Sequence, residues 1–248
     1  YSRGGMWHSI YMGDDSDIRK LKEFDSGKAM FMFGVTLIMA LYHINLFLLQ
    51  KRTKAALYFG VLLLIVAIRI TITGEYLILN FIPAASIKWM VPIEYMTMYW
   101  GVIMTIAFVH DLYPEEIPKK IMKNALYAGI VMSIFTIITP ISIFTKYLMF
   151  YEALIITMYA YILFSIIRAV IRKRESSALL LVEAIVILAT FINDVLYYWN
   201  ETYDKYGPSI EIAVFMVIFI QSYILAERFS VTFDKIENLS KKLISLDK

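Results

Sequence analysis

The sequence predicts an all-α membrane protein, a seven-transmembrane helix bundle whose C-terminal helix continues as a coiled coil. Hydrophobic residues make up 60% of the chain, charged residues only 18%, and the mean hydropathy is +0.65. A soluble domain is roughly 45–50% apolar. The chain also contains seven apolar stretches of about the length that a bilayer core of about 30 Å requires. Finally, the apolar residues of the tail recur with heptad spacing, which is typical of a coiled coil.

The seven apolar stretches are the predicted membrane spans. Each must be helical, because lipid offers no hydrogen-bond partner to backbone N–H and C=O groups. The fourth is the shortest, and Pro140 closes it. Short connections make helices that follow each other in sequence antiparallel neighbours. The expected spans are Met30–Gln50, Ala55–Thr73, Met90–Leu112, Asn124–Thr139, Leu148–Val170, Leu179–Trp199 and Ile210–Arg228.

The distribution of Lys and Arg among the loops predicts the orientation in the membrane. Cytoplasmic loops of membrane proteins carry an excess of these residues. The first, third and fifth loops carry Lys51, Arg52, Lys54, Lys119, Lys120, Lys123, Arg172, Lys173 and Arg174. The other loops carry Lys88, Lys146 and Lys205. We therefore expect a multi-pass membrane protein with its N-terminus outside and its C-terminus in the cytoplasm.

Residues 1–27 are polar and lack the apolar core and cleavage pattern of a signal peptide. Glycines and an alternation of Trp7, Ile10 and Tyr11 predict the end of an extracellular β-rich sensor domain and its linker, with a plain linker as the alternative. Residues 28–229 would form the seven-transmembrane domain, and residues 230–248 the start of a cytoplasmic signalling coiled coil. Because the chain begins at Tyr1 and not at Met, we expect the middle piece of a longer protein.

The tail carries an a/d seam that predicts a parallel homodimer. Its positions, at alternating steps of three and four, are Phe229, Thr232, Ile236, Leu239, Leu243 and Leu246. About two and a half heptads are fewer than a stable coiled coil needs, so we expect the seam to continue in further residues. A membrane helix that leaves the bilayer as a coiled coil favours a signal transducer over an enzyme.

Polar residues within the spans are candidates for function, because charges inside lipid are costly. Those placed in the outer half are candidates for ligand binding or for a polar switch, namely Arg69, Glu94, Glu152, Asn193 and Asp194. Glu75 and Glu211 lie at the same depth, at helix ends. We expect these groups to face one cavity, and Arg69 to pair with Asp194 or Glu94. The alternative is a structural pair together with acids that face water.

The inner half of the spans holds a second set of polar residues, which suits hydrogen bonds between helices. These are His43, Asn45, His110, Asp111, Glu183, Gln221, Ser222 and Glu227. Gln221 and Ser222 lie shortly before the heptad seam, so we expect them to relay a shift of the last helix into the tail. Within the seam, Ile236, Leu239 and Leu243 would transmit that shift to the attached domains.

Other classes of protein fit less well. Without cysteine and with only three histidines, a metal hydrolase would depend on His43, His110 and Asp111, which have no ligand spacing. No Lys between Ile210 and Glu227 could bind retinal, no basic patch suggests nucleic acid, and no cofactor or catalytic residue is predicted. A small-solute transporter is the main alternative, although the glycines are scattered and no inverted repeat is visible. The metal hydrolase is the weaker one.

Three segments resemble a known family, the bacterial seven-transmembrane receptors with diverse intracellular signalling modules. GGMWHSIYMGDDSDI is similar to the closing strands of that family's extracellular sensor domain, and GVTLIMALYHINLFLLQKRTKAALYFGVLLLIVAIRI to its first helical hairpin. QSYILAERFSVTFDKIENLSKKLISL resembles the family's last helix and its exit into a signalling helix. HDLYPEE and FINDVLYY add to the likeness.

The resemblance implies a receptor core in the bacterial inner membrane that passes an extracellular or membrane signal through helix seven to a cytoplasmic output domain. In that family the output is a histidine kinase, a nucleotide or diguanylate cyclase, or a phosphatase. The resemblance also implies a polar role for Arg69, Asn193, Asp194 and Gln221, and a transmission role for Arg228 and Phe229. It supplies no catalytic residue in the membrane region.

Overall fold

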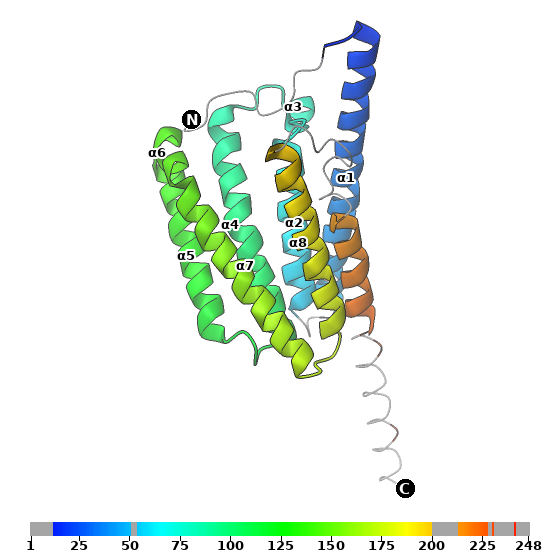
Figure 1. The fold of residues 1–248 in the computed structure, drawn as a ribbon, viewed down its shortest axis with the longest axis vertical. Coiled ribbons are helices and arrows are strands. Elements are labelled where there is room, and N and C mark those ends of the chain that lie inside the picture. Colours follow the sequence, from blue (N-terminus) through cyan, green and yellow to red (C-terminus); the bar gives the residue numbers. More distant parts are fainter. Residues whose placement is uncertain (1–11, 51–53, 200–212, 228–229, 231–240, 242–248) are drawn as a thin grey trace. The chain divides into compact units, whose positions relative to one another are not determined.

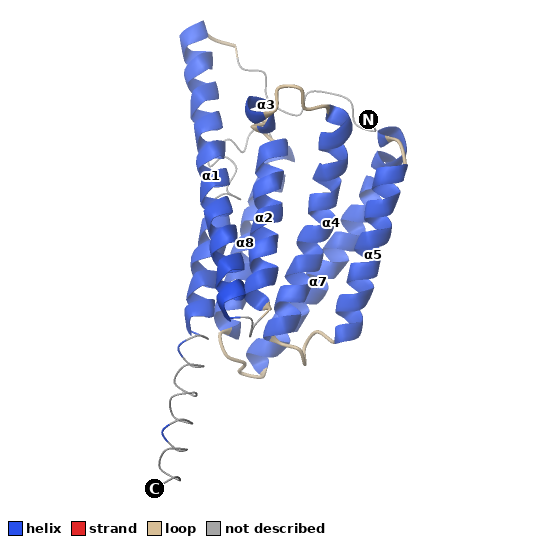
Figure 2. Ribbon diagram, turned by 180° about the vertical axis from the view of Figure 1, so that it is seen from behind, coloured by secondary structure: helices blue, strands red, loops and turns tan. Residues whose placement is uncertain are grey.

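The computed structural model describes residues 12–50, 54–199, 213–227, 230 and 241. Within these residues the secondary structure is helical and contains no strand (Figure 2). The predicted all-α class is confirmed. The chain divides into two compact units, residues 1–165 and residues 166–248.

The long helices of the first unit follow the predicted spans (Figure 1). They are α1 (Asp15–Gln50), α2 (Ala55–Ile72), α4 (Ile87–Leu112), α5 (Lys119–Ile138) and most of α7 (Leu148–Ile171). The connections add three short helical elements that the sequence analysis did not predict, because each is too short to show a helical hydropathy pattern. These are α3 (Ile78–Phe81), α6 (Ile141–Phe144) and the 3-10 helix η1 (Thr145–Tyr147).

The second unit contains α8 (Ser177–Trp199) and a helix at Ala213–Glu227, which we name the last helix. The last helix lies within its predicted span, and α8 begins two residues before the predicted start at Leu179. The expected seam residues Phe229, Ile236, Leu239 and Leu243, together with Arg228, fall outside the described residues. The coiled coil therefore stays a prediction.

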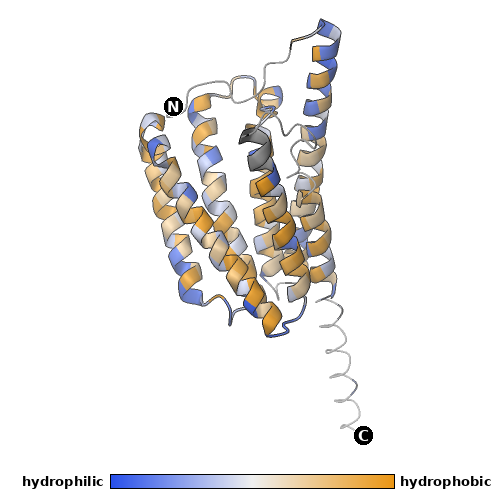
Figure 3. Ribbon diagram, in the orientation of Figure 1, coloured by the Kyte–Doolittle hydropathy of each residue, from blue (hydrophilic) through white to orange (hydrophobic). Residues whose placement is uncertain are grey.

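Several helices are apolar and long enough to cross a membrane. Within the described residues, five helical segments meet both conditions, and two shorter apolar helices are Ser177–Thr190 and Ala213–Glu227. Hydrophobic colour dominates the ribbon of these helices (Figure 3). Large apolar side chains such as Phe31, Ile38 and Phe164 are more than half exposed, as expected for side chains that face lipid. These features are typical of a multi-pass membrane protein.

Helix α1 begins at Asp15, well before the expected start of the first span at Met30. Two acids in its first turn favour a helix N-terminus, and an Asp15–Arg19 ion pair of 3.1 Å stabilises the same turn. The predicted linker before the first span is therefore helical from Asp15 onward. The predicted strand residues Trp7, Ile10 and Tyr11 lie outside the described residues.

The α1–α2 hairpin is packed through small side chains. A Cβ atom added at Gly60 would lie 2.8 Å from Ile44 Cγ1 and 3.0 Å from the carbonyl oxygen of Ala40. Ala40 and Ala56 are buried beside this contact. Small residues let two membrane helices approach closely and gain dispersion contacts along their backbones. Gly60 is thus needed for the close approach of α1 and α2.

Aromatic residues form the core where α4 meets α6 and α7. Tyr95, Tyr99, Phe144 and Tyr151 are buried together, and the ring centroids of Tyr95 and Phe144 lie 5.1 Å apart in an edge-on arrangement. Such pairs are more favourable than burial alone would make them. The Tyr99 hydroxyl lies 3.3 Å from Thr136 Oγ1 on α5 and so links this core to that helix.

Candidate functional site

The predicted polar cluster of the outer half contains one formed ion pair. Arg69, in the last turn of α2, places its Nη2 atom 3.8 Å from Glu94 Oε1 on α4. Its Nη1 atom donates to the Glu94 carbonyl oxygen at 3.1 Å and to Thr97 Oγ1 at 3.2 Å. The expected pairing of Arg69 with Glu94 is confirmed. Three acceptors on α4 therefore hold one guanidinium at the end of α2.

The exposure of this pair limits its contribution to stability. The side chains of Arg69 and Glu94 are 38% and 37% exposed. Ion pairs that water can reach contribute about 0–1 kcal/mol. The arrangement fixes the direction of the guanidinium more than it stabilises the bundle, and it leaves the charged groups accessible to an anionic or cationic ligand.

Of the other outer candidates, Glu152 belongs to the same unit as this pair, and Asn193 and Asp194 belong to the second unit. Glu152 lies just after the first turn of α7 and is half-buried, with no hydrogen bond or ion pair to Arg69 or Glu94. Asn193 on α8 is half-buried. Asp194 is on the same helix, but its side chain lies outside the described residues, as does Glu211. A shared cavity for these groups stays a prediction.

A second polar cluster lies at the opposite end of α4. Asp111 Oδ2 accepts a hydrogen bond of 2.7 Å from the backbone N–H of Ala55, the first residue of α2. The preceding Lys54 gives α2 no side-chain cap. His110 is buried, and its Nδ1 lies 2.6 Å from the Ile117 carbonyl oxygen. Asp111 thus caps a helix distant in sequence, and the HDLYPEE segment orders the turn after α4.

His43 on α1 is fully buried in the first unit. Its Nδ1 lies 2.9 Å from the Met39 carbonyl oxygen, and its ring packs edge-on against Phe59 on α2 at a centroid distance of 4.9 Å. No group of three or more His, Asp or Glu side chains that could hold a metal ion occurs among the described residues. The histidine packs between helices rather than beside a carboxylate.

The last helix is attached to α8 through polar side chains. Gln221 is fully buried, and its Nε2 donates to Glu183 Oε2 on α8. Glu183 is itself buried, with 7% of its surface exposed. Ser176, just before α8, donates to Glu227 Oε2 at 2.7 Å. Within the described residues, Gln221 Oε1 and Ser222 Oγ are buried without a hydrogen-bond partner. The sequence singled out Gln221, Ser222 and Glu183, but not their pairing.

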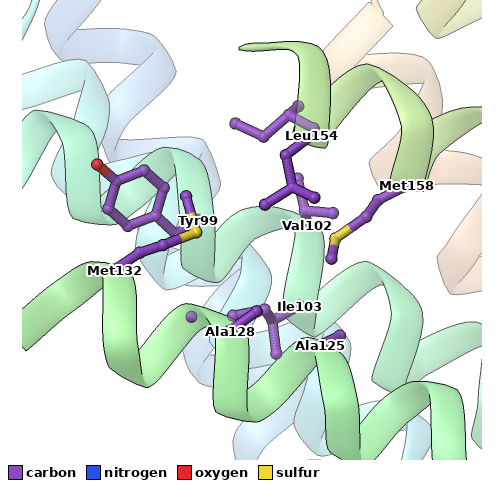
Figure 4. A pocket seen from close by; sticks show the side chains of 10 residues that line it. Tyr99, Val102, Ile103, Ala125, Ala128, Met132, Leu154 and Met158 are labelled. Atoms are coloured by element: carbon purple, nitrogen blue, oxygen red, sulfur yellow. The ribbon is translucent and has the colours of Figure 1, made fainter. Parts of the chain in front are cut away.

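The cavity between α4, α5 and α7 is apolar and nearly filled. Figure 4 shows Ile103, Met132, Leu154 and Met158 around it. The space open to the centre of a water-sized sphere is about 10 Å³, which is about what one water needs. A Cβ atom at Gly129 would collide with the end of the Ile103 side chain. This space is a packing seam and does not accommodate an organic ligand.

Comparison with known proteins identifies a family. Residues 28–228, most of the chain, match the family model described as 7TM diverse intracellular signalling. The matched range contains Arg69, Glu94, Glu183 and Gln221. No curated protein and no solved structure matches the chain.

Proposed function

Because the chain belongs to the 7TM diverse intracellular signalling family, we propose that its last helix transmits a signal across the membrane to a cytoplasmic output domain. Membership makes the chain a membrane signalling receptor module. In this proposal the N-terminal side faces outside and receives the signal from an extracellular ligand or sensor domain. The output is a kinase, a cyclase, a diguanylate cyclase or a phosphatase elsewhere in the full-length protein, and the membrane region itself performs no catalysis.

The buried contact between Gln221 and Glu183 carries this proposal. A hydrogen bond between two membrane helices is worth about 0.6–2 kcal/mol, so exchanging one for another costs little. Close steric packing between helices cannot be exchanged in this way, because a packed interface has few discrete arrangements. The last helix is therefore held by a contact that can be exchanged, close to the point where the tail begins.

Ser222 supplies the second arrangement. Adjacent residues on a helix point about 100° apart, and the Ser222 hydroxyl is buried without a partner among the described residues. A rotation of the last helix toward Ser222 would replace one polar contact with Glu183 by another. The same rotation would turn the seam at Ile236, Leu239 and Leu243 and so change the packing of two tails. An external ligand needs only a differential affinity for the two arrangements.

The absence of cysteine from the chain makes the proposal testable by cysteine scanning. Single cysteines at successive positions from 233 to 246 are introduced into the full chain in membranes, and disulfide formation between copies is measured. We expect maxima at the seam positions within this range, namely Ile236, Leu239, Leu243 and Leu246. We expect Gln221→Leu to move these maxima by about one position, because the contact that sets the rotation is lost.

Tyr223→Leu is the matched control, because Tyr223 lies on the same helix and is 59% exposed. It should leave the profile unchanged. A flat profile in the unsubstituted chain would contradict the predicted seam. Maxima that stay in place in Gln221→Leu would show that Gln221 does not set the rotation of the tail.

A further inference from the structure

The outward face of α1 repeats like a helix-pairing seam. Its exposed members follow each other at steps of seven, four and three, and at about 100° per residue they fall within an arc of roughly 60°. We name this set the α1 face: Phe24, Phe31, Ile38, Tyr42, Asn45 and Leu49. Val35 lies on the same line and is half-buried. A repeat of 3.5 residues is the pattern of left-handed helix pairs, which is also common between membrane helices.

Asn45 is the unexpected member of this face. It is exposed within a segment long and apolar enough to cross a membrane, roughly 7 Å along the axis from the end of α1 at Gln50. Its side chain makes no hydrogen bond with any other described residue. A carboxamide carries two donors and two acceptor lone pairs, and in hydrocarbon none of them can bond to solvent. The face therefore contains a polar group that requires a polar partner.

A second copy of the chain offers that partner. Two copies in one membrane have the same orientation, so their α1 helices run parallel, and equivalent seam positions meet. A carboxamide is its own complement, because the amide N–H of one copy can donate to the carbonyl oxygen of the other. Two reciprocal hydrogen bonds would then satisfy both Asn45 side chains, while the apolar members of the face pack against each other.

The part of α1 before the membrane supports the same pairing. Helix α1 has 36 residues, so it is about 54 Å long and extends beyond a bilayer core of about 30 Å. The seam continues into this extension through Leu21 and Phe24, both exposed. With Leu21 at an a position, Lys20 and Asp25 take the g and e positions that form ion pairs across a parallel helix pair, and Lys28 takes the next a position. A single Lys at an a position fixes the register of a helix pair at a cost in stability. The charges at g and e thus favour another α1 as the occupant.

We propose that the α1 face docks against the same face of a second copy, with Asn45 hydrogen-bonded to its equivalent. The contact does not depend on the proposed signalling role of the last helix. It is also separate from the predicted coiled coil of the tail. It would give the receptor module a dimer interface within the membrane and along the segment just before it.

Disulfide cross-linking of the full chain in membranes tests this interface. Single cysteines replace Ile38, Tyr42 or Leu49 on the α1 face, and Leu41 or Leu48 as controls. The controls are exposed apolar residues of the same helix, 56% and 58% exposed, beside Tyr42 at 54%. Leu41 and Leu48 lie roughly 70° and 90° from the middle of the seam. We expect dimers linked through the first three positions and not through the controls, because a disulfide requires Cα atoms less than about 7 Å apart.

Asn45→Val then separates the polar contact from apolar packing. Two hydrogen bonds between membrane helices, at the low end of their measured strength, correspond to roughly an eightfold change in the dimerisation constant. We expect Asn45→Val to lower the dimerisation constant by that factor. The decrease is measured by cross-linking through Tyr42→Cys, and by energy transfer between labelled copies that are diluted with added lipid. Asn45→Gln, which keeps the carboxamide, should restore most of the dimerisation. The double substitution Ile236→Lys and Leu239→Lys, which breaks the predicted tail seam, should leave the α1 cross-links in place.

Several results would overturn the proposal. Equal cross-linking at Leu41 and Tyr42 would mean random collision of copies. Efficient cross-links between the α1 face and another helix of the same copy would assign the face to the chain's own fold. Unchanged association in Asn45→Val would mean that lipid headgroups or water satisfy the carboxamide. Loss of the α1 cross-links when the tail seam is broken would make the α1 contact a consequence of the tail.

Discussion

The α1–α2 hairpin and the pair formed by α8 and the last helix are held together by different forces. The hairpin is packed so closely at Gly60 that even one added carbon would meet backbone atoms of α1. The other pair is joined by hydrogen bonds from Gln221 to Glu183 and from Ser176 to Glu227. Close packing permits one arrangement, whereas hydrogen bonds between polar side chains can exchange partners. In the proposed function, the first pair is therefore the fixed support and the second is the pair that moves.

The largest effect is expected where the packing is steric and the introduced side chain is large. Gly60→Ala should destabilise the protein by about 1–2 kcal/mol, because overpacking costs about 1–3 kcal/mol and the gain in helix propensity offsets at most about 1 kcal/mol. Gly60→Leu should prevent folding. Thermal unfolding in detergent, followed by loss of the monodisperse peak, measures both. If the protein tolerated a larger side chain at this position, the α1–α2 hairpin would not be fixed by close packing.

Gly101→Ala is the matched control for this prediction. Gly101 lies inside α4, and a Cβ atom there would have nothing within 4 Å. Only the propensity term remains, so this substitution should be neutral or stabilising by up to about 1 kcal/mol. The two Gly→Ala variants should therefore differ in sign. If both destabilise equally, the cost comes from the helix backbone and not from the approach of α1.

Substitutions at the polar pair should have comparable single effects that do not add. Gln221→Leu leaves the buried Glu183 carboxyl group without its amide donor, and Glu183→Leu leaves the Gln221 amide unpaired. Each should cost about 1–3 kcal/mol, the cost of a buried polar group that loses its partner. The double variant should be more stable than the sum of the two single effects predicts, because two apolar side chains leave nothing unsatisfied.

A double-mutant cycle on thermal unfolding measures this coupling. Additive effects, within about 0.5 kcal/mol, would mean that the two side chains do not interact in the membrane. The comparison would be sharpened if the Gln221→Leu, Glu183→Leu double variant were stable but had altered positions of the cross-linking maxima in the cysteine scan of the tail. That result would show that the polar contact is needed for movement rather than for folding.

The sequence predicted the helices well because hydropathy and length determine membrane spans. It missed the start of α1 at Asp15, because the charged residues before Met30 hide a helix stabilised by local ion pairs. The Arg69–Glu94 pair was predictable, since the end of one span and the start of the next place both residues at the same depth. Depth alone, however, did not distinguish Glu94 from Asp194 as the partner.

Contacts distant in sequence were beyond prediction where several partners were available. Asp111 was expected to make a hydrogen bond between helices, but its acceptor role at the N-terminus of α2 depends on how α4 packs against α2. Gln221 and Glu183 were both assigned to the inner half, and only the packing of α8 with the last helix joins them. A sequence gives the depth of a polar residue in the bilayer, and the rotation of its helix then decides the partner.

The smallest effect is expected at the Arg69–Glu94 pair, which resembles neither region of the comparison. Its side chains are more than a third exposed, so solvent screens the attraction and the coupling should be below about 1 kcal/mol. A cycle of Arg69→Ala, Glu94→Ala and the double variant measures it by thermal unfolding, with and without added salt. Coupling that persists in high salt would mean that the pair is shielded from water in the membrane. In that case the polar contact between α2 and α4 would be as strong as that between α8 and the last helix. A polar contact between helices would then no longer distinguish α8 and the last helix from the rest of the protein.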